Sequence, residues 1–155
     1  MYAQPAVERW LSPRSRDRMA EYVRENRERH AVDGFGILAV VRKDDSRVIG
    51  RAGMLVWDDR TWMPTTLRDA GEHGEVEIGW ALHPDAWGRG YATEASVVCR
   101  DFVLAQVRPR VIALIDPDNV RSIAVAERLG LAHEHDVLLK GEKPARVYAL
   151  EGEPE

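Results

Sequence analysis

The chain is 155 residues long, which suits one domain with a buried core, and its 45% hydrophobic and 31% charged residues are ordinary for a globular protein. A net charge of −4 argues against a nucleic-acid partner, and no apolar run approaches the roughly 20 residues that cross a bilayer. The one cysteine, Cys99, rules out an internal disulfide and agrees with a reducing cytoplasm. We therefore expect a single cytoplasmic domain over residues 1–155, without a membrane segment.

The first part of the chain predicts a helix followed by a strand pair. Ser12-Pro13 has the pattern of an N-cap followed by proline at the first helical position, and we expect this helix to end near His30. Its thin apolar face comprises Met19, Tyr22 and Val23. Gly36–Arg42 and Val48–Trp57 are apolar segments joined by a polar turn, which predicts an antiparallel hairpin.

The middle of the chain predicts a long loop and then a half-buried strand. Asp58–Gly74 contains several turn-forming residues, and we expect an irregular segment that is either a functional flap or locally disordered. Glu75–Leu82 alternates between apolar and other residues, as a strand with one covered face does. The apolar face carries Val76, Ile78, Trp80 and Leu82. The opposite face carries Glu75, Glu77, Gly79 and Ala81.

The second half of the chain adds two helices and three strands. The first helix is predicted from apolar residues at i, i+3, i+4 and i+7 spacing. Its predicted buried stripe comprises Ala95, Val98, Cys99, Phe102, Val103 and Gln106. Val111–Ile115 predicts a central strand, and Val120–Leu129 a short helix that Gly130 ends. His133–Lys140 and Arg146–Leu150 predict a terminal hairpin. This order predicts an α/β domain, with a mixed sheet and helices on its faces.

Residues 79–94, GWALHPDAWGRGYATE, join the half-buried strand to the following helix through a glycine turn. Gly88 and Gly90 carry no Cβ, so the backbone N–H groups around them can closely approach a charged ligand. The start of the helix adds unpaired N–H groups and the positive end of a helix dipole. The pattern therefore predicts a cradle for a pyrophosphate.

Two motifs in this order resemble the GCN5-related N-acetyltransferase (GNAT) family, and within it the RimJ/RimL-like branch. They are EIGWALHPDAWGRGYATEA at 77–95 and IALIDPDNVRSIAVAERLGL at 112–131, separated by one amphipathic helix. The resemblance covers about Gly34 to Leu150. It implies a mixed, mainly antiparallel central sheet flanked by helices. It also implies an acyltransferase that moves an acetyl group from acetyl-coenzyme A (acetyl-CoA) to a primary amine, which is a protein N-terminus, an amino acid or a small-molecule amine.

The resemblance also implies where acetyl-CoA binds. Backbone N–H groups of the glycine turn would hold its pyrophosphate, and the pantetheine arm would lie where the strand before the turn splays from Val111–Ile115. The implied cofactor-binding residues are Leu82, Trp87, Gly88, Arg89, Gly90, Tyr91, Ala92 and Asn119. The chain departs from the family at Asp85, where a cation or an amide is usual. Asn119 is equally explained as a helix N-cap, and Arg89 as an exposed charge.

The catalytic assignments are carried over residue by residue. Glu77 is the candidate general base, acting through water, because it points to one face of the strand that leads to the cofactor site. Many family members use a tyrosine as general acid, but Ala126 stands at the matching position. Ser122, one turn earlier, is the candidate substitute. A backbone N–H of Gly79 or Trp80 would contact the oxyanion.

Two other functions were weighed against acetyl transfer. A dinucleotide-dependent oxidoreductase is disfavoured, because Thr93 stands where the third glycine of that fingerprint is needed. A GNAT-like module that binds CoA without catalysis is favoured by Ala126. It is also favoured by the N-terminus, which starts later than the family's usual first strand and helix. Either Met1 is not the natural start, or the sheet has one strand fewer and its bared edge is covered by a loop or by the partner in a homodimer.

No metal is expected. His133 and His135 lie two apart on a predicted strand and would share a face, but no carboxylate or cysteine completes a ligand set there. The role of Trp57, Trp62 and Met63 stays open between an acceptor-site lid, a subunit contact and a cover for the core.

Overall fold

The computed structural model describes residues 5–9, 11 and 15–152, so the predicted N-cap Ser12 lies outside the described residues. A short helix, α1 (Pro5–Glu8), precedes the long helix α2 (Arg16–Asp33). The Ser15 hydroxyl caps α2 by accepting from the backbone N–H of Arg18 at 3.2 Å. Gly34, with φ of 77°, ends α2 in the left-handed conformation that glycine adopts without steric cost.

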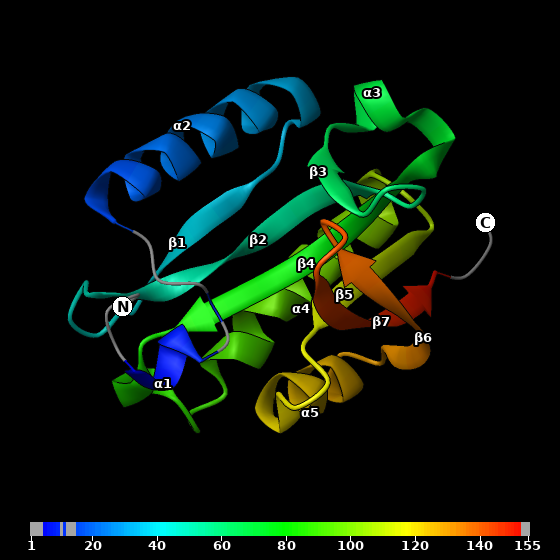
Figure 1. Cartoon of the computed structure of the whole chain (residues 1–155). Helices are drawn as coiled ribbons and strands as arrows, with labels where there is room; N and C mark the ends of the chain where they lie inside the picture. Colours follow the sequence, from blue (N-terminus) through cyan, green and yellow to red (C-terminus); the bar gives the residue numbers. More distant parts are fainter. Residues whose placement is uncertain (1–4, 10, 12–14, 153–155) are drawn as a thin grey trace.

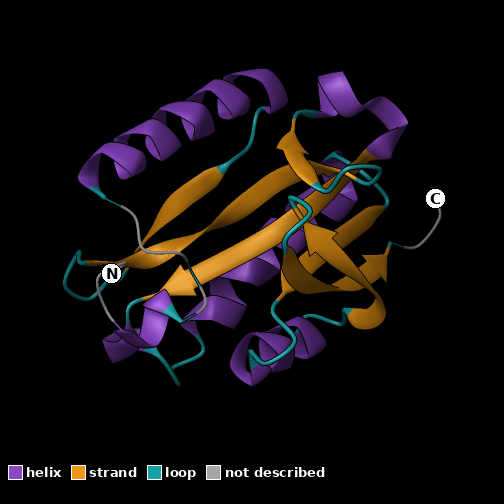
Figure 2. Ribbon diagram, viewed as in Figure 1, coloured by secondary structure: helices purple, strands orange, loops and turns teal. Residues whose placement is uncertain are grey.

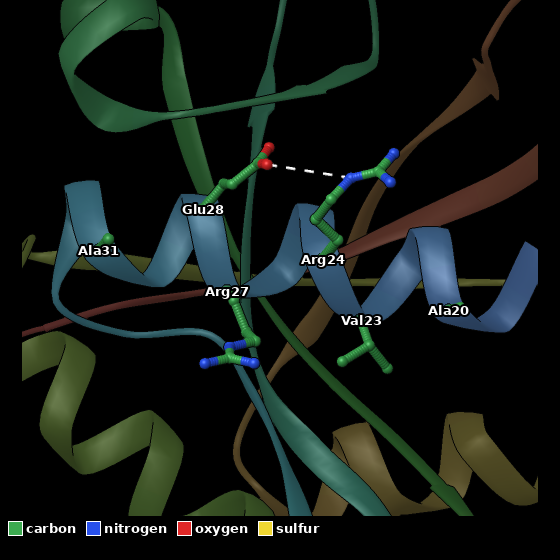
Figure 3. Close-up of a pocket in the computed structure, with 6 residues that line it drawn as sticks. All are labelled: Ala20, Val23, Arg24, Arg27, Glu28 and Ala31. Carbon is green, nitrogen blue, oxygen red and sulfur yellow. Dashed lines mark ion pairs between the residues drawn. The ribbon is translucent and has the colours of Figure 1, made fainter.

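The outer face of α2 carries a shallow depression whose six lining residues all come from this helix (Figure 3). Val23, a member of the thin apolar face, lines this depression and is 49% exposed, so that face is not fully covered by the sheet. The helix is held by polar contacts instead, because the Asn26 amide donates to the carbonyl of Ile37 and accepts from its N–H, at 2.8 and 2.9 Å.

One mixed sheet forms the centre of the molecule (Figures 1 and 2). Its strands are β1 (Ile37–Val41), β2 (Val48–Asp58), β3 (Met63–Thr65), β4 (Gly74–Leu82), β5 (Arg110–Ile115), β6 (Ala132–Leu139) and β7 (Lys143–Glu151). The spatial order is β1-β2-β4-β5-β7-β6, and β3 pairs with β2. Strands β4 and β5 run parallel, whereas the other pairs are antiparallel. The predicted fold class is therefore confirmed, and within the described residues β1 is the first strand and forms one edge.

The segment between β2 and β4 is ordered, which corrects the prediction of an irregular loop over Asp58–Gly74. It contains β3, the helix α3 (Leu67–Ala70) and a 3-10 turn, η1 (Gly71–His73). Local polar contacts explain the order, because the Thr66 hydroxyl accepts from the N–H of Asp69 and caps α3. The Asp33 carboxylate accepts from the N–H of Leu67 at 3.0 Å and ties α3 to the end of α2.

Two helices follow β4 and β5. A 3-10 turn, η2 (Pro84–Ala86), leads into α4 (Tyr91–Gln106), which packs across β2, β4 and β5 on the sheet face opposite α2 (Figure 1). The helix α5 (Val120–Arg128) follows β5 and contacts both it and α4. The alternation in β4 is confirmed, because Val76 and Ile78 lie in the core that α4 covers.

The buried side of α4 differs from the predicted stripe. Val98 and Phe102 are 68% and 41% exposed, whereas Ser96 and Val103 are buried. Cys99 and Leu104 also pack against this core, so the predicted residues Cys99 and Val103 are on the contact face, whereas Val98 and Phe102 are not.

Candidate active site

The glycine turn leaves backbone open to solvent at the C-terminal end of β4. Gly88 and Gly90 have φ of 72° and 81°, a left-handed conformation that L side chains rarely adopt. A Cβ built at either position meets no atom within 4 Å. Gly90 is also the N-cap of α4 and provides no side-chain cap, so the N–H groups of the first helical turn face outward unblocked. This backbone fits a phosphate-bearing ligand.

The side chains around the turn form a small, packed support. The Trp87 indole donates to the carbonyl of Leu82 at 2.9 Å, and Leu82 is buried against Ala86 and Ile49. Half-buried side chains of Tyr91 and Ala92 pack onto the same cluster. Their contacts tie the turn to the end of β4.

Charged side chains at the turn are few. The Arg121 guanidinium, from α5, lies 4.7 Å from the centroid of the Trp87 ring. Arg89 is exposed and forms no ion pair with a described residue, which leaves its charge available to a ligand. Asp85 is exposed, and its Oδ2 lies 3.5 Å from Nδ1 of His83.

Strands β4 and β5 meet at a single position among the described residues. Glu77 on β4 pairs with Ile112 on β5, whereas β4 pairs along its length with β2, and β5 with β7. The stretch Ile78–Leu82 therefore runs toward the glycine turn without a β5 partner. This is the splayed geometry that the resemblance implies, and backbone groups on that edge of β4 are free to pair with an extended ligand.

Glu77 stands at the last paired position before the splay. Burial raises the pKa of its carboxyl group to about 7, while the Trp57 indole, the charge of Arg51 and the backbone of Leu114 oppose the shift. The indole N–H of Trp57 donates to Glu77 Oε2 at 2.6 Å. A carboxyl group with this pKa is divided between its two protonation states near neutral pH, as a general base requires.

The start of α5 holds the other two predicted side chains. The Asn119 side chain accepts from the N–H of Ser122 at 3.2 Å, so its helix-capping interpretation is confirmed. Ser122 is half-buried in the first turn of α5. Ala126 is fully buried in the core, so this position offers no side chain that could donate a proton.

An open groove lies at the opposite end of β4 from the glycine turn. It runs between the turn that precedes β3 and the strand β6, and its lining includes Asp59, Trp62, Glu75, His135 and Asp136. The rings of Trp62 and His135 are 6.1 Å apart. Glu75 lies on the same face of β4 as Glu77, so the groove begins one strand repeat from the candidate base.

The two histidines of β6 do not share a face, contrary to the prediction. A register shift between them pairs His133 with Tyr148 and His135 with Val147, which are neighbours on β7 and point to opposite sides. His133 lies against the Tyr148 ring, and His135 against Trp62. Among the described residues no group of three His, Cys, Asp or Glu side chains is placed to hold a metal ion.

Comparison with known proteins decides the family. Residues 1–132 match the family model described as the acetyltransferase (GNAT) domain, which is most of the chain. The chain belongs to the GNAT family. The resemblance that the two sequence motifs carry is thereby confirmed.

Individual curated relatives of this GNAT chain align with only part of its sequence. The uncharacterized protein YkkB of Bacillus subtilis (strain 168) is 40% identical over 74 residues, which are 47% of this chain and 42% of YkkB. This GNAT chain spans about half the length of the curated relatives that it matches, or less.

Solved structures share the fold of this GNAT chain. The acetyltransferase of Agrobacterium tumefaciens str. C58 superposes with a TM-score of 0.75 at 24% identity, covering 97% of this chain and 80% of that one. The ribosomal-protein-S5-alanine acetyltransferase of Vibrio fischeri gives a TM-score of 0.69 at 18% identity, covering 96% and 81%. Both likenesses show a shared fold.

No helix in the described part of the chain is long and apolar enough to cross a membrane.

Two contacts of this GNAT site were not predicted from the sequence. Nothing local in the sequence shows that the Trp57 indole reaches Glu77, because the two residues meet only through the β2–β4 register. The second contact joins Arg121 to Trp87. Its signal in the sequence is an arginine in the first turn of the helix after Val111–Ile115, together with a tryptophan in the glycine turn.

Proposed function

We propose that this protein is an N-acetyltransferase that moves the acetyl group of acetyl-CoA to a primary amine. The observation that supports the proposal is the environment of the Glu77 carboxyl group. Its carboxyl group has a pKa of about 7 and lies where β4 and β5 separate, on the strand that ends in the open glycine turn. A base and a phosphate cradle on one strand suit this reaction.

Acetyl-CoA would supply an activated acetyl group as a thioester. We assign its pyrophosphate to the backbone of Trp87–Ala92, where the glycines leave room, with Arg89 adding a charged contact. The edge of β4 between Glu77 and Leu82 would bind the pantetheine arm, since it has no pairing with β5. Asn119 remains a proposed contact from the start of α5.

Glu77 would accept the proton that the amine must lose. Its carboxylate takes that proton, directly or through one water, as the nitrogen–carbon bond forms and the carbon–sulfur bond breaks. Ser122 is the proposed donor to the departing sulfur, because Ala126 stands where the resemblance implies a tyrosine. The products are an N-substituted acetamide and a free thiol. The proton balance closes when Glu77 releases its proton to solvent and the Ser122 hydroxyl regains one from solvent.

The amine acceptor would enter from the opposite end of β4. The groove lined by Asp59, Trp62 and Glu75 begins one strand repeat from Glu77, whereas the glycine turn lies beyond the other end of the splay. Acceptor and acetyl-CoA would then approach the same carboxylate from opposite directions. The proposal names the acceptor as a primary amine and no more narrowly.

The test measures thiol release from acetyl-CoA with a panel of N-terminal peptides, amino acids and small amines. Glu77→Gln is expected to lower kcat by roughly 10²–10⁴-fold while the Kd for acetyl-CoA is retained. Glu151→Gln, which removes an exposed strand carboxylate on β7, is the matched control and is expected to retain kcat. Equal turnover in Glu77→Gln and wild type would contradict the assignment of the base.

A CoA-binding module without catalysis is the alternative, and Ala126 is the residue that favours it. Saturable acetyl-CoA binding in calorimetry, with no thiol release for any amine of the panel, would favour this alternative. Saturable binding together with amine-dependent thiol release would exclude it.

A further inference from the structure

The two carboxylate oxygens of Glu77 have different side-chain surroundings. Oε2 accepts from the Trp57 indole at 2.6 Å. Oε1 lies over Gly79, where an ideal Cβ would be 3.7 Å from it, and this glycine stands one strand repeat closer to the glycine turn. One oxygen is therefore fixed by a side chain, whereas the other borders a position that has none.

Trp57 is itself held firmly. Its backbone lies at a position where β2 pairs with β4 on one side, opposite Glu75, and with β3 on the other, opposite Pro64. The residue is 7% exposed. An indole N–H can only donate, so its partner must be an acceptor, and a carboxylate oxygen is the strongest acceptor in reach.

We propose that Trp57 is a positioning residue that holds the Glu77 carboxylate at the apex of the β4–β5 splay through its indole N–H. The hydrogen bond fixes Oε2 and leaves Oε1 to receive the proton of the substrate amine. This inference rests on the proposed function for its kinetic consequence, but the contact between the two residues does not.

The electrostatic surroundings make the role measurable. Arg51 on β2 is the charged group that acts on Glu77, together with the backbone of Leu114 on β5. Glu75, on the same face of β4, is paired with Arg110 at 3.0 Å. With these unchanged, loss of the indole N–H removes a donor that stabilises the carboxylate, so the pKa of Glu77 rises further.

The experiment compares Trp57→Phe with wild type. Phenylalanine retains an aromatic ring but has no N–H. The midpoint of the pH profile of kcat is expected to rise by about one pH unit, with the KM for acetyl-CoA unchanged. Val56→Ala is the matched control, because Val56 is a buried neighbour on β2 whose side chain points to the other face. It should lower stability without moving the midpoint, and an equal shift in both variants would overturn the proposal.

A carboxyl 13C NMR titration separates this inference from the proposed function. The Glu77 resonance, assigned by its loss in Glu77→Gln, is expected to titrate about one pH unit higher in Trp57→Phe without any substrate present. In wild type, the chemical shift of the Trp57 indole 1H–15N signal is expected to change with pH at the same midpoint as the Glu77 titration. This measurement does not depend on whether a variant folds. If the Trp57 indole signal does not shift with the Glu77 midpoint, the proposal is overturned even if acetyl transfer is observed. Coupled titrations without acetyl transfer would uphold the contact and contradict the function.

Discussion

The glycine turn after β4 and the Glu77 site within β4 are built from different parts of the chain. The glycine turn is made of backbone that Gly88 and Gly90 leave open, and the Trp87–Leu82 hydrogen bond ties it to the end of β4. In the middle of the strand, Glu77 depends on side chains and backbone from two other strands, β2 and β5. The glycine turn is therefore sensitive to an added side chain at Gly88 or Gly90, whereas the pKa of Glu77 is sensitive to the loss of a neighbouring group.

The largest effect is expected where a side chain enters the backbone site. Gly88→Val would place a branched side chain at a left-handed position and fill the space assigned to pyrophosphate, so acetyl-CoA binding should be lost in calorimetry. Gly34→Val is the control, because Gly34 has φ of 77°, meets no atom within 4 Å and caps α2 away from the turn. Both variants should lose stability, by about 1–2 kcal/mol. Loss of binding in both would show strain rather than a cradle.

The carboxylate site should also govern how stability depends on pH. The Glu77 pKa is raised from 4.5 to about 7 in the folded protein, so the folded state holds this proton more tightly than the unfolded chain does. Its contribution is present below about pH 4.5 and is lost as the pH rises through about 7. Glu77→Gln should therefore gain up to about 3 kcal/mol over wild type in urea unfolding at pH 8 and little at pH 4.5. A constant difference at both pH values would contradict the raised pKa.

A smaller effect is expected between the two regions. Gly79 has ordinary extended backbone, so Gly79→Val is compatible with β4, but its side chain would contact Glu77 Oε1. Turnover should fall by roughly 10–100-fold through misplacement of the reacting groups, by a larger factor than acetyl-CoA affinity, because Gly79 also lies on the β4 edge assigned to the pantetheine arm. Steady-state kinetics measure the loss of turnover, and calorimetry measures the loss of affinity. A loss of affinity with normal kcat would contradict the predicted effect on Glu77.

The smallest effect is expected at the Trp87–Arg121 stack. Arg121→Gln removes a cation that lies 4.7 Å from the Trp87 ring and leaves the backbone of the turn intact. A cation–π contact of this kind is worth about 1 kcal/mol, so the Kd for acetyl-CoA should rise by only about fivefold. Arg128→Gln, in the last turn of the same helix, is the control. A loss comparable to that of Gly88→Val would mean that Arg121 binds the ligand directly.

The same contrast explains what could be predicted from the sequence. The glycine turn, the strand alternation and the order of elements follow local rules, so Gly88, Gly90 and the β4 faces were placed correctly. The Trp57–Glu77 contact depends on the register of β2 against β4, and the opposite faces of His133 and His135 depend on a bulge, neither of which leaves a local pattern. The buried side of α4 was misjudged because Ser96 packs there despite its hydroxyl.

The role of Glu77 as the base is tested by the pH profile of acetyl transfer at saturating acetyl-CoA, for wild type and Glu77→Gln. Wild-type kcat is expected to rise with pH through a midpoint near 7, as the carboxylate becomes free to accept a proton, and then to level off. In Glu77→Gln the rate should be low and this inflection should be absent. Profiles of the same shape and height in both proteins would contradict the claim that Glu77 is the base.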